Sequence, residues 1–216
     1  MSNSDSFIDE VNEEVRRDRL NRLLRRYGWI VVLVVVIAVG GAGYNEWRKA
    51  RQTATAEAAG DAMLAALDAT TPSERATALE GLDFDGDLAA LRNLMAAGQL
   101  AADDSAAATT QLEAVISNPD APPLYRDLAT LRLAMLPESP LLSDEKLERL
   151  APLTAAGAPF RLTALELSAL LHIERQENAE ALELLETVAN DVSALPTQQA
   201  RAEELIRALG GLPDNS

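Results

Sequence analysis

The stretch that decides the fold is LRNLM at residues 91–95, because its pattern returns twice further along the chain. YRDLA follows 34 residues later at 125–129, and FRLTA follows after another 35 at 160–164. In each stretch the first residue is large and the fourth and fifth are apolar or small, so all three side chains share one face of a helix. This period predicts an array of repeated helical units, each of which packs one face on the next.

The second half of the repeated unit supports this interpretation. A small residue precedes a large one by one helical turn at two matching places, Ala108-x3-Leu112 and Ala181-x3-Leu185. Together the two spacings resemble the tetratricopeptide repeat, and Pro119 stands at that repeat's closing proline. Gly98 replaces the usual tyrosine, and the second hairpin lacks the small-x3-large step. A generic array of helical hairpins has almost the same period and remains an alternative.

Local signals predict where the helices begin and which side chains they bury. Thr71-Pro72-Ser73-Glu74 has a cap residue, a proline at the first helical position and a Glu at the capping-box position. DFDGD at 83–87 looks like part of a calcium loop, but its Gly is fourth rather than sixth and its twelfth residue is Leu94 rather than Glu. We interpret it as a turn whose Asp87 caps a helix starting at Leu88. Apolar stripes predict further helices at Leu88, Leu91, Leu94 and Met95; Ala108, Leu112, Val115 and Ile116; Tyr125, Leu128, Ala129 and Leu133; Leu147 and Leu150; Phe160, Ala164, Leu167 and Leu171; Ala181, Leu185 and Val188; and Ala202, Leu205, Ile206 and Leu209.

Ahead of the repeats lies an uncharged run, GWIVVLVVVIAVGGAGY at residues 28–44. Its helical length of roughly 26 Å approaches the thickness of a bilayer core. Aromatic rings flank it in the positions that favour the membrane interface, and we predict a membrane anchor formed by Tyr27, Trp29, Tyr44 and Trp47. A buried core helix and a cleaved signal peptide are the alternatives. Residues 1–26, ahead of the run, include six acidic groups, which is unlike the short basic leader of a signal peptide.

The charges beside this run predict its orientation. Six arginines precede it, whereas Arg48, Lys49 and Arg51 alone follow it closely. The positive-inside rule therefore places the N-terminus in the cytoplasm and the rest of the chain across the membrane. We expect a cytoplasmic tail at 1–26, a transmembrane helix at 27–47, a linker helix at 48–70 and a repeat domain at 71–216. Within the span, three small residues predict a face for close packing against another helix: Ala38, Gly41 and Ala42.

The linker helix has its own apolar stripe, which we expect to pack on the repeat domain. It consists of Ala56, Ala59, Met63 and Leu67 at steps of three and four residues. The chain beyond the span is rich in Ala and Leu and poor in aromatic residues, so helix is favoured nearly everywhere and no sheet is expected.

Composition also limits the function. Residues 52–216 have 27 Asp and Glu against 10 Lys and Arg, a net charge of about −17, which disfavours nucleic acid as a partner. There is no cysteine, and His172, the single histidine, lies between apolar residues, so we interpret it as packed rather than as a metal ligand. Five Glu residues stepping by threes from 174 to 186 are typical of a solvated helix face. No phosphate-binding, nucleophile-elbow or zinc-protease motif occurs, and we predict a chain that is not an enzyme, with no catalytic, cofactor-binding or metal residues.

One tail, one span, an alanine-rich linker and about three degenerate hairpins together resemble the YfgM family, the tetratricopeptide-like ancillary subunits of the bacterial Sec translocon. FIDEVNEEVRRDRL at 7–20 is similar to the start of alphaproteobacterial members. The resemblance implies an inner-membrane protein with a periplasmic repeat domain. Its partners would be the Sec translocon channel and a membrane-anchored periplasmic chaperone, and it would link secreted chains to periplasmic chaperones. The alternative is a single-pass membrane sensor or regulator that signals through its cytoplasmic tail.

Overall fold

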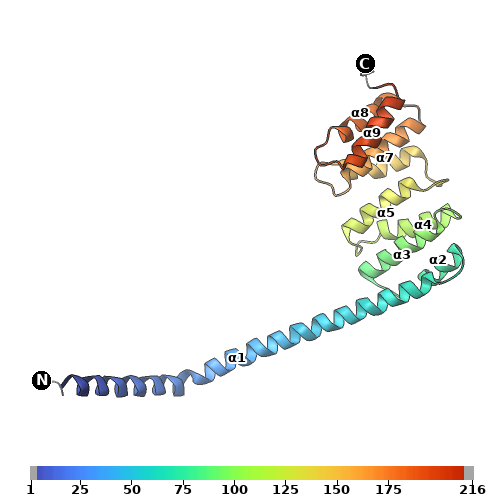
Figure 1. The fold of residues 1–216 in the computed structure, drawn as a ribbon. Helices are drawn as coiled ribbons and strands as arrows, with labels where there is room; N and C mark the ends of the chain where they lie inside the picture. Colours follow the sequence, from blue (N-terminus) through green and yellow to red (C-terminus); the bar gives the residue numbers. More distant parts are fainter. Residues whose placement is uncertain (1–3, 212–216) are drawn as a thin grey trace. The chain divides into compact units, whose positions relative to one another are not determined.

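The computed structural model describes residues 4–211, and every regular element in that range is a helix (Figure 1). The predicted all-α architecture is confirmed for these residues. The chain divides into two compact units, Met1–Ala58 and Ala59–Ser216. The helices are α1 (Ser4–Leu67), α2 (Pro72–Glu80), α3 (Gly86–Leu100), α4 (Ser105–Ile116), α5 (Pro123–Met135), α6 (Ser143–Leu150), the 3-10 helix η1 (Ala151–Thr154), α7 (Arg161–Glu174), α8 (Asn178–Ala189) and α9 (Pro196–Ala208).

The first unit is formed by α1 as far as Ala58. Its side chains are described at residues 29, 33, 34, 36 and 37 and from 39 onward, and all of these are exposed. Among the residues described, no helix is both long enough and apolar enough to span a membrane. Tyr27, Ala38 and part of the 28–44 run lie outside the described side chains, so the span stays a prediction.

The last turns of α1 belong to the second unit. Ala59, Met63 and Ala66 are buried there, and Leu67 is half-buried against the same core. Ala56 is exposed, so the predicted apolar stripe begins one turn later than expected. Residues assigned to the linker helix thus contribute to the core of the repeats.

Of the two helix caps predicted from the sequence, the structure confirms the one at Thr71. Thr71 and Glu74 form a complete capping box, in which the Thr71 hydroxyl accepts from the Glu74 N–H at 3.2 Å and the Glu74 carboxylate accepts from the Thr71 N–H at 3.0 Å. Asp104 caps α4 by accepting from the Ala107 N–H at 2.9 Å. The predicted cap at Asp87 is wrong, because α3 starts at Gly86 and places Asp87 in its first turn. Gly86 has φ +55°, a conformation that glycine adopts without steric cost.

The second unit is built from three hairpins, α3 with α4, α5 with α6, and α7 with α8, and the flanking helices α2 and α9 pack on α3 and α8. Its apolar core forms three clusters in series. The first core extends from the end of α1 to α5, the middle core joins α5, α6, η1 and α7, and the last core joins α7, α8 and α9. Their buried residues include Leu79, Leu94, Leu112 and Leu133 in the first core, Leu131, Leu150, Leu153 and Ala164 in the middle core, and Ala169, Ala181, Leu185 and Ile206 in the last core.

Two helices each bury a different face in two cores. Helix α5 contributes Ala129 and Leu133 to the first core but Leu131 and Ala134 to the middle core. Helix α7 likewise divides its buried residues between the middle and last cores. Units that contact only their neighbours in this way are typical of repeat proteins.

Burial agrees with the predicted small-x3-large step. Ala108 and Leu112 on α4 are as fully buried as Ala181 and Leu185 on α8, with exposures of 0–1%. Leu94 and Leu128 stand at the same place of the repeated stretch and are therefore predicted to be equally buried. They are not, because Leu94 is buried and Leu128 is half-buried.

The second hairpin differs from its neighbours in its second helix. Helix α6 has only 8 residues and passes directly into η1 at Ala151, next to Pro152. Proline lacks the N–H that an α-helix needs and crowds the preceding turn, which accounts for the early end. Leu150 and Leu153, which flank this junction, are buried in the middle core.

Candidate interaction groove

The repeat period brings a second set of side chains together on the outside of the hairpins. Ten residues after the start of each repeated stretch stand Ala101, Met135 and Leu170. Met135 is 62% exposed and Leu170 is 38% exposed, whereas Ala101 is half-buried. One helical turn earlier stand Gly98, Arg132 and Leu167. These six residues lie along the first helix of each hairpin or directly after its end. All six line at least one of two adjoining cavities.

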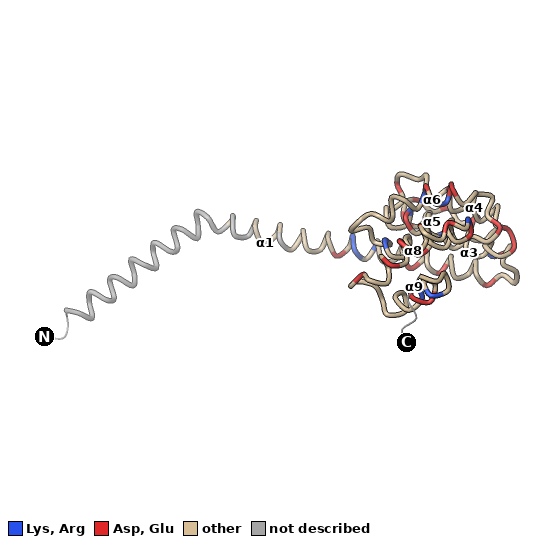
Figure 2. The backbone as a smooth tube through the Cα atoms, turned by 90° about the horizontal axis from the view of Figure 1, so that it is seen from above, with Lys and Arg blue, Asp and Glu red and all other residues tan. Residues whose placement is uncertain are grey.

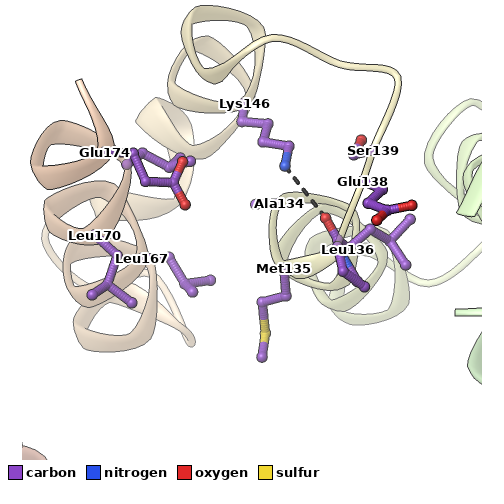
Figure 3. Close-up of a pocket in the computed structure, with 11 residues that line it drawn as sticks. Ala134, Met135, Leu136, Glu138, Ser139, Lys146, Leu167, Leu170 and Glu174 are labelled. Carbon is purple, nitrogen blue, oxygen red and sulfur yellow. Dashed lines mark hydrogen bonds between the residues drawn. The ribbon is translucent and has the colours of Figure 1, made fainter. Parts of the chain in front are cut away.

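The two cavities meet at the end of α5 and together form what we call the Met135 groove. The smaller, of about 250 Å³, lies between α3, α4 and α5, and the larger, of about 470 Å³, lies between α5, α6 and α7. Both are lined by Met135, Leu136 and Pro137. In Figure 3 the Met135 side chain extends into the gap opposite Leu167 and Leu170. The groove is therefore apolar at its centre.

Gly98 shapes the smaller cavity. A Cβ atom placed on it would lie 3.6 Å from Arg132 Nη1, and this nitrogen donates a hydrogen bond to the Leu94 carbonyl at 3.0 Å. Arg132 therefore lies against the backbone of α3. A tyrosine, the usual residue of the repeat at this position, would place its ring here, so the departure from the repeat pattern helps to open the cavity.

Charged groups stand at the edge of the larger cavity. Lys146 on α6 and Glu174 on α7 both line it, and in Figure 3 they approach it from different helices. The Lys146 ammonium lies 3.5 Å from the Leu136 carbonyl, which is long for a hydrogen bond. Within the part of the chain that the structure describes, Lys146 forms no ion pair. A cation and a carboxylate beside an apolar centre suit a peptide segment, whose backbone and side chains offer both kinds of partner.

The second unit as a whole has more acidic than basic residues. Asp and Glu residues are spread over the helices of the second unit, and Lys and Arg are fewer (Figure 2). Exposed glutamates on α8 include Glu180, Glu183 and Glu186, as the spacing predicted. Glu177 differs, because it is half-buried and its carboxylate accepts from His172 Nδ1 at 2.7 Å and from Arg175 Nε at 3.0 Å. The hydrogen bond from His172, followed by that from Arg175, lowers the pKa of Glu177.

The hydrogen bond between His172 and Glu177 therefore lies at the turn between α7 and α8. Among the described residues, no cluster of His, Asp and Glu side chains is arranged to hold a metal ion. The turn itself is tight. Gln176 has φ +64°, and the Glu177 N–H donates to the His172 carbonyl at 2.9 Å, which closes the end of α7.

The predicted membrane residues lie in the first unit, away from the groove in sequence. Trp29 and Tyr44 are each 64% exposed and Trp47 is 51% exposed, while the side chain of Tyr27 lies outside the described residues. In the predicted helix-packing face, Gly41 and Ala42 are exposed and no atom lies within 4 Å of a Cβ placed on Gly41. Both sets stay predictions.

The sequence pattern identifies Gly98 and Leu167 for other reasons but does not predict a groove or its exposed residues Met135 and Leu170. Met135 and Leu170 lie outside the apolar stripes by which the sequence identifies the helices, so those stripes do not single them out. The signal was nevertheless present, since extending the 34- and 35-residue period by ten positions aligns Ala101, Met135 and Leu170.

The fold and the groove define a class of helical repeat proteins that bind other proteins along the first helices of their hairpins. Residues 22–181 match the model of the tetratricopeptide repeat-like domain family, and the chain belongs to this family. The match includes the 28–44 run as well as the hairpins up to the start of α8. No curated protein matches the chain. No solved structure matches it either. Domains of this class are typically non-catalytic protein-interaction modules, which supports a protein-binding role in general.

Proposed function

We propose that the chain is a non-enzymatic scaffold, anchored in the bacterial inner membrane, that holds a protein segment in the Met135 groove. In this proposal the repeat domain lies in the periplasm beside the Sec translocon channel and links secreted chains to a membrane-anchored chaperone. The observation that carries it is the groove itself, in which equivalent positions of two successive repeats, Met135 and Leu170, present exposed apolar side chains next to two cavities, and half-buried Ala101 stands at the same position of the first repeat. The translocon and the chaperone enter through the sequence resemblance to the YfgM family.

The groove has the properties needed to bind varied segments. Methionine is unbranched and has three rotatable bonds, so Met135 adapts to different apolar side chains on either side of it. Leu167 and Leu170 supply a second apolar wall, and the net negative charge of residues 52–216 attracts the basic residues of a client. A scaffold that serves many secreted chains requires this combination of adaptable apolar contact and non-specific charge attraction.

The membrane anchor is supported by the sequence. The 28–44 run contains no charged residue, its ends have aromatic rings, and the family match begins at residue 22, ahead of the run. A C-terminal alkaline phosphatase fusion should be active and an N-terminal fusion inactive, because the arginines before Tyr27 outnumber the basic residues after Trp47. The opposite result would reject the periplasmic location. Deletion of residues 2–15 should leave partner binding intact, whereas a sensor that signals through its tail would lose its output.

The groove is tested by placing a charge at its centre. Met135→Glu in the full-length chain should strongly reduce recovery of the translocon channel and the chaperone from detergent-solubilised membranes, because the carboxylate would be buried against apolar groups of the bound segment. Leu142→Glu is the matched control: Leu142 is also apolar and 69% exposed, and it lines neither cavity. Circular dichroism should show equal folding for both. Equal recovery with both variants would place recognition outside the groove.

A further inference from the structure

The part of α1 that follows the predicted span has an aromatic and cationic stripe. Tyr44, Trp47 and Arg51 are spaced by three and four residues and therefore share one helix face. The rings of Tyr44 and Trp47 lie 6.0 Å apart at 38°, and the Arg51 guanidinium carbon lies 4.2 Å above the Trp47 ring. This last distance is that of a cation–π contact.

The cation–π contact positions Arg51 without occupying its hydrogen-bond donors. A guanidinium stacked on a ring keeps its N–H groups in the plane, where they can bind a phosphate through two parallel hydrogen bonds. No carboxylate within the described part of the chain forms an ion pair with Arg51. Arg48, four residues after Tyr44, adds a second guanidinium next to the same face.

The charge pattern around this stripe indicates what it binds. Arg48, Lys49 and Arg51 are the only basic residues between Tyr27 and Arg75, and the chain after them has a net charge of about −17. The stripe begins at Tyr44, the last residue of the uncharged run, so its rings continue an apolar surface and its cations come next. Apolar surface, then aromatic rings, then cations is the order of groups that matches lipid tails, glycerol backbone and phosphate.

We propose that Tyr44, Trp47 and Arg51, with Arg48, form a binding site for the phosphate of an anionic phospholipid. Arg51, stacked on Trp47, binds the phosphate, and the two rings lie against the glycerol backbone. This inference rests on the proposed membrane anchor, since the site needs the run before Tyr44 in the bilayer. It adds a lipid preference that anchoring alone does not require.

The test uses Trp47 as a local probe. The chain has two tryptophans, so Trp29→Phe leaves Trp47 as the single emitter. The full-length variant is reconstituted in phosphatidylcholine vesicles containing either brominated phosphatidylglycerol or brominated phosphatidylcholine at the same mole fraction, and quenching of Trp47 is measured. The local readout matters because the arginines before Tyr27 also attract anionic lipid.

Brominated phosphatidylglycerol should quench Trp47 more strongly than brominated phosphatidylcholine. Arg51→Gln should reduce this preference roughly fivefold, which is about 1 kcal/mol for one arginine near an anionic surface. Arg51→Lys should retain part of it, because the charge remains and the planar donors are lost. Arg207→Gln, at an exposed arginine of α9, is the control and should change nothing.

The possible outcomes separate this inference from the proposed anchor. An unchanged preference in Arg51→Gln would overturn the lipid site while leaving the anchor intact. Abolition of the preference by added inorganic phosphate would also overturn it, because the site would then accept the free ion. Failure of the chain to float with the vesicles in a density gradient would reject the anchor itself.

Discussion

Paired Leu→Ala substitutions test whether the repeat domain is stabilised by separate cores in series. Leu112 on α4 and Leu185 on α8 occupy the same step of two repeats, and both are at most 1% exposed. Leu112 belongs to the first core and Leu185 to the last, and these two cores have no residue in common. We expect Leu112→Ala and Leu185→Ala to destabilise the domain by similar amounts but in different places.

The magnitude follows from the atoms removed. Each substitution deletes three carbons from a fully buried side chain, which at about 0.8 kcal/mol per buried methylene is about 2.4 kcal/mol of lost transfer free energy. Incomplete collapse of the space left behind adds a cavity term, which brings the expected cost to about 2–5 kcal/mol. Because the sites have no common packing partner, the two costs should add to within about 0.5 kcal/mol in the double variant.

Hydrogen exchange of the full-length chain in detergent, with urea unfolding, measures both quantities. Leu112→Ala should lower amide protection in α2 to α5, and Leu185→Ala should lower it in α7 to α9. Glu183→Ala, at an exposed position on α8, is the control and should change stability by less than about 0.5 kcal/mol. Uniform loss of protection from α2 to α9 in either variant would mean that the domain opens as one unit, and the serial-core reasoning would fail.

Two further predictions concern the turns of the last repeat. Hydrogen bonds from the Ser193 hydroxyl and N–H, and then from Arg161, lower the pKa of Asp191 from 3.8 to about 2. Because the pKa of this carboxyl is lower in the folded state, its ionised form stabilises the fold above pH 3.8, and this stabilisation is lost as the pH falls to about 2. The difference in Tm between wild type and Asp191→Asn should therefore shrink between pH 3.8 and about 2. A difference in Tm that stays constant over this range would contradict the prediction. Gln176→Gly should stabilise the domain by roughly 0.5 kcal/mol in urea unfolding. The free energy gained by relieving the φ +64° conformation exceeds the conformational entropy that glycine adds to the unfolded chain. Glu180→Gly, on the exposed face of α8, is the control and should cost about 1 kcal/mol.

The sequence was most informative where one local rule decided the outcome. The capping box at Thr71 and Glu74 needs only four consecutive residues, and it formed as predicted. The 34-residue period identified the hairpins because every unit must bury a face on the next, whatever its exact sequence. The prediction of Asp87 as a cap is wrong because three aspartates and a glycine within five residues offer several equivalent starts, and the glycine at 86 allows the earlier one.

Tertiary packing decided the features that the sequence did not reveal. In the stripe predicted for α3, Leu94 is buried and its other members are half-buried, whereas the corresponding Leu128 lies on a helix that divides its buried residues between two cores. The buried residues of α5 are divided between two faces of the helix. Leu128 lies between these two faces and is only half-buried. The groove was missed for the same reason, since Met135 belongs to neither buried face of α5.

Helix α5 explains why binding and stability can be separated in this domain. One face of it, with Ala129 and Leu133, fixes it to the first core, and another, with Leu131 and Ala134, fixes it to the middle core. The remaining face presents Met135 to both cavities of the groove. A side chain held on a helix that is packed from two sides has a fixed position before any partner arrives, which limits the entropy lost on binding. Substitutions at Met135 therefore change the groove without removing a core contact, which is the condition that a test of recognition by Met135→Glu requires.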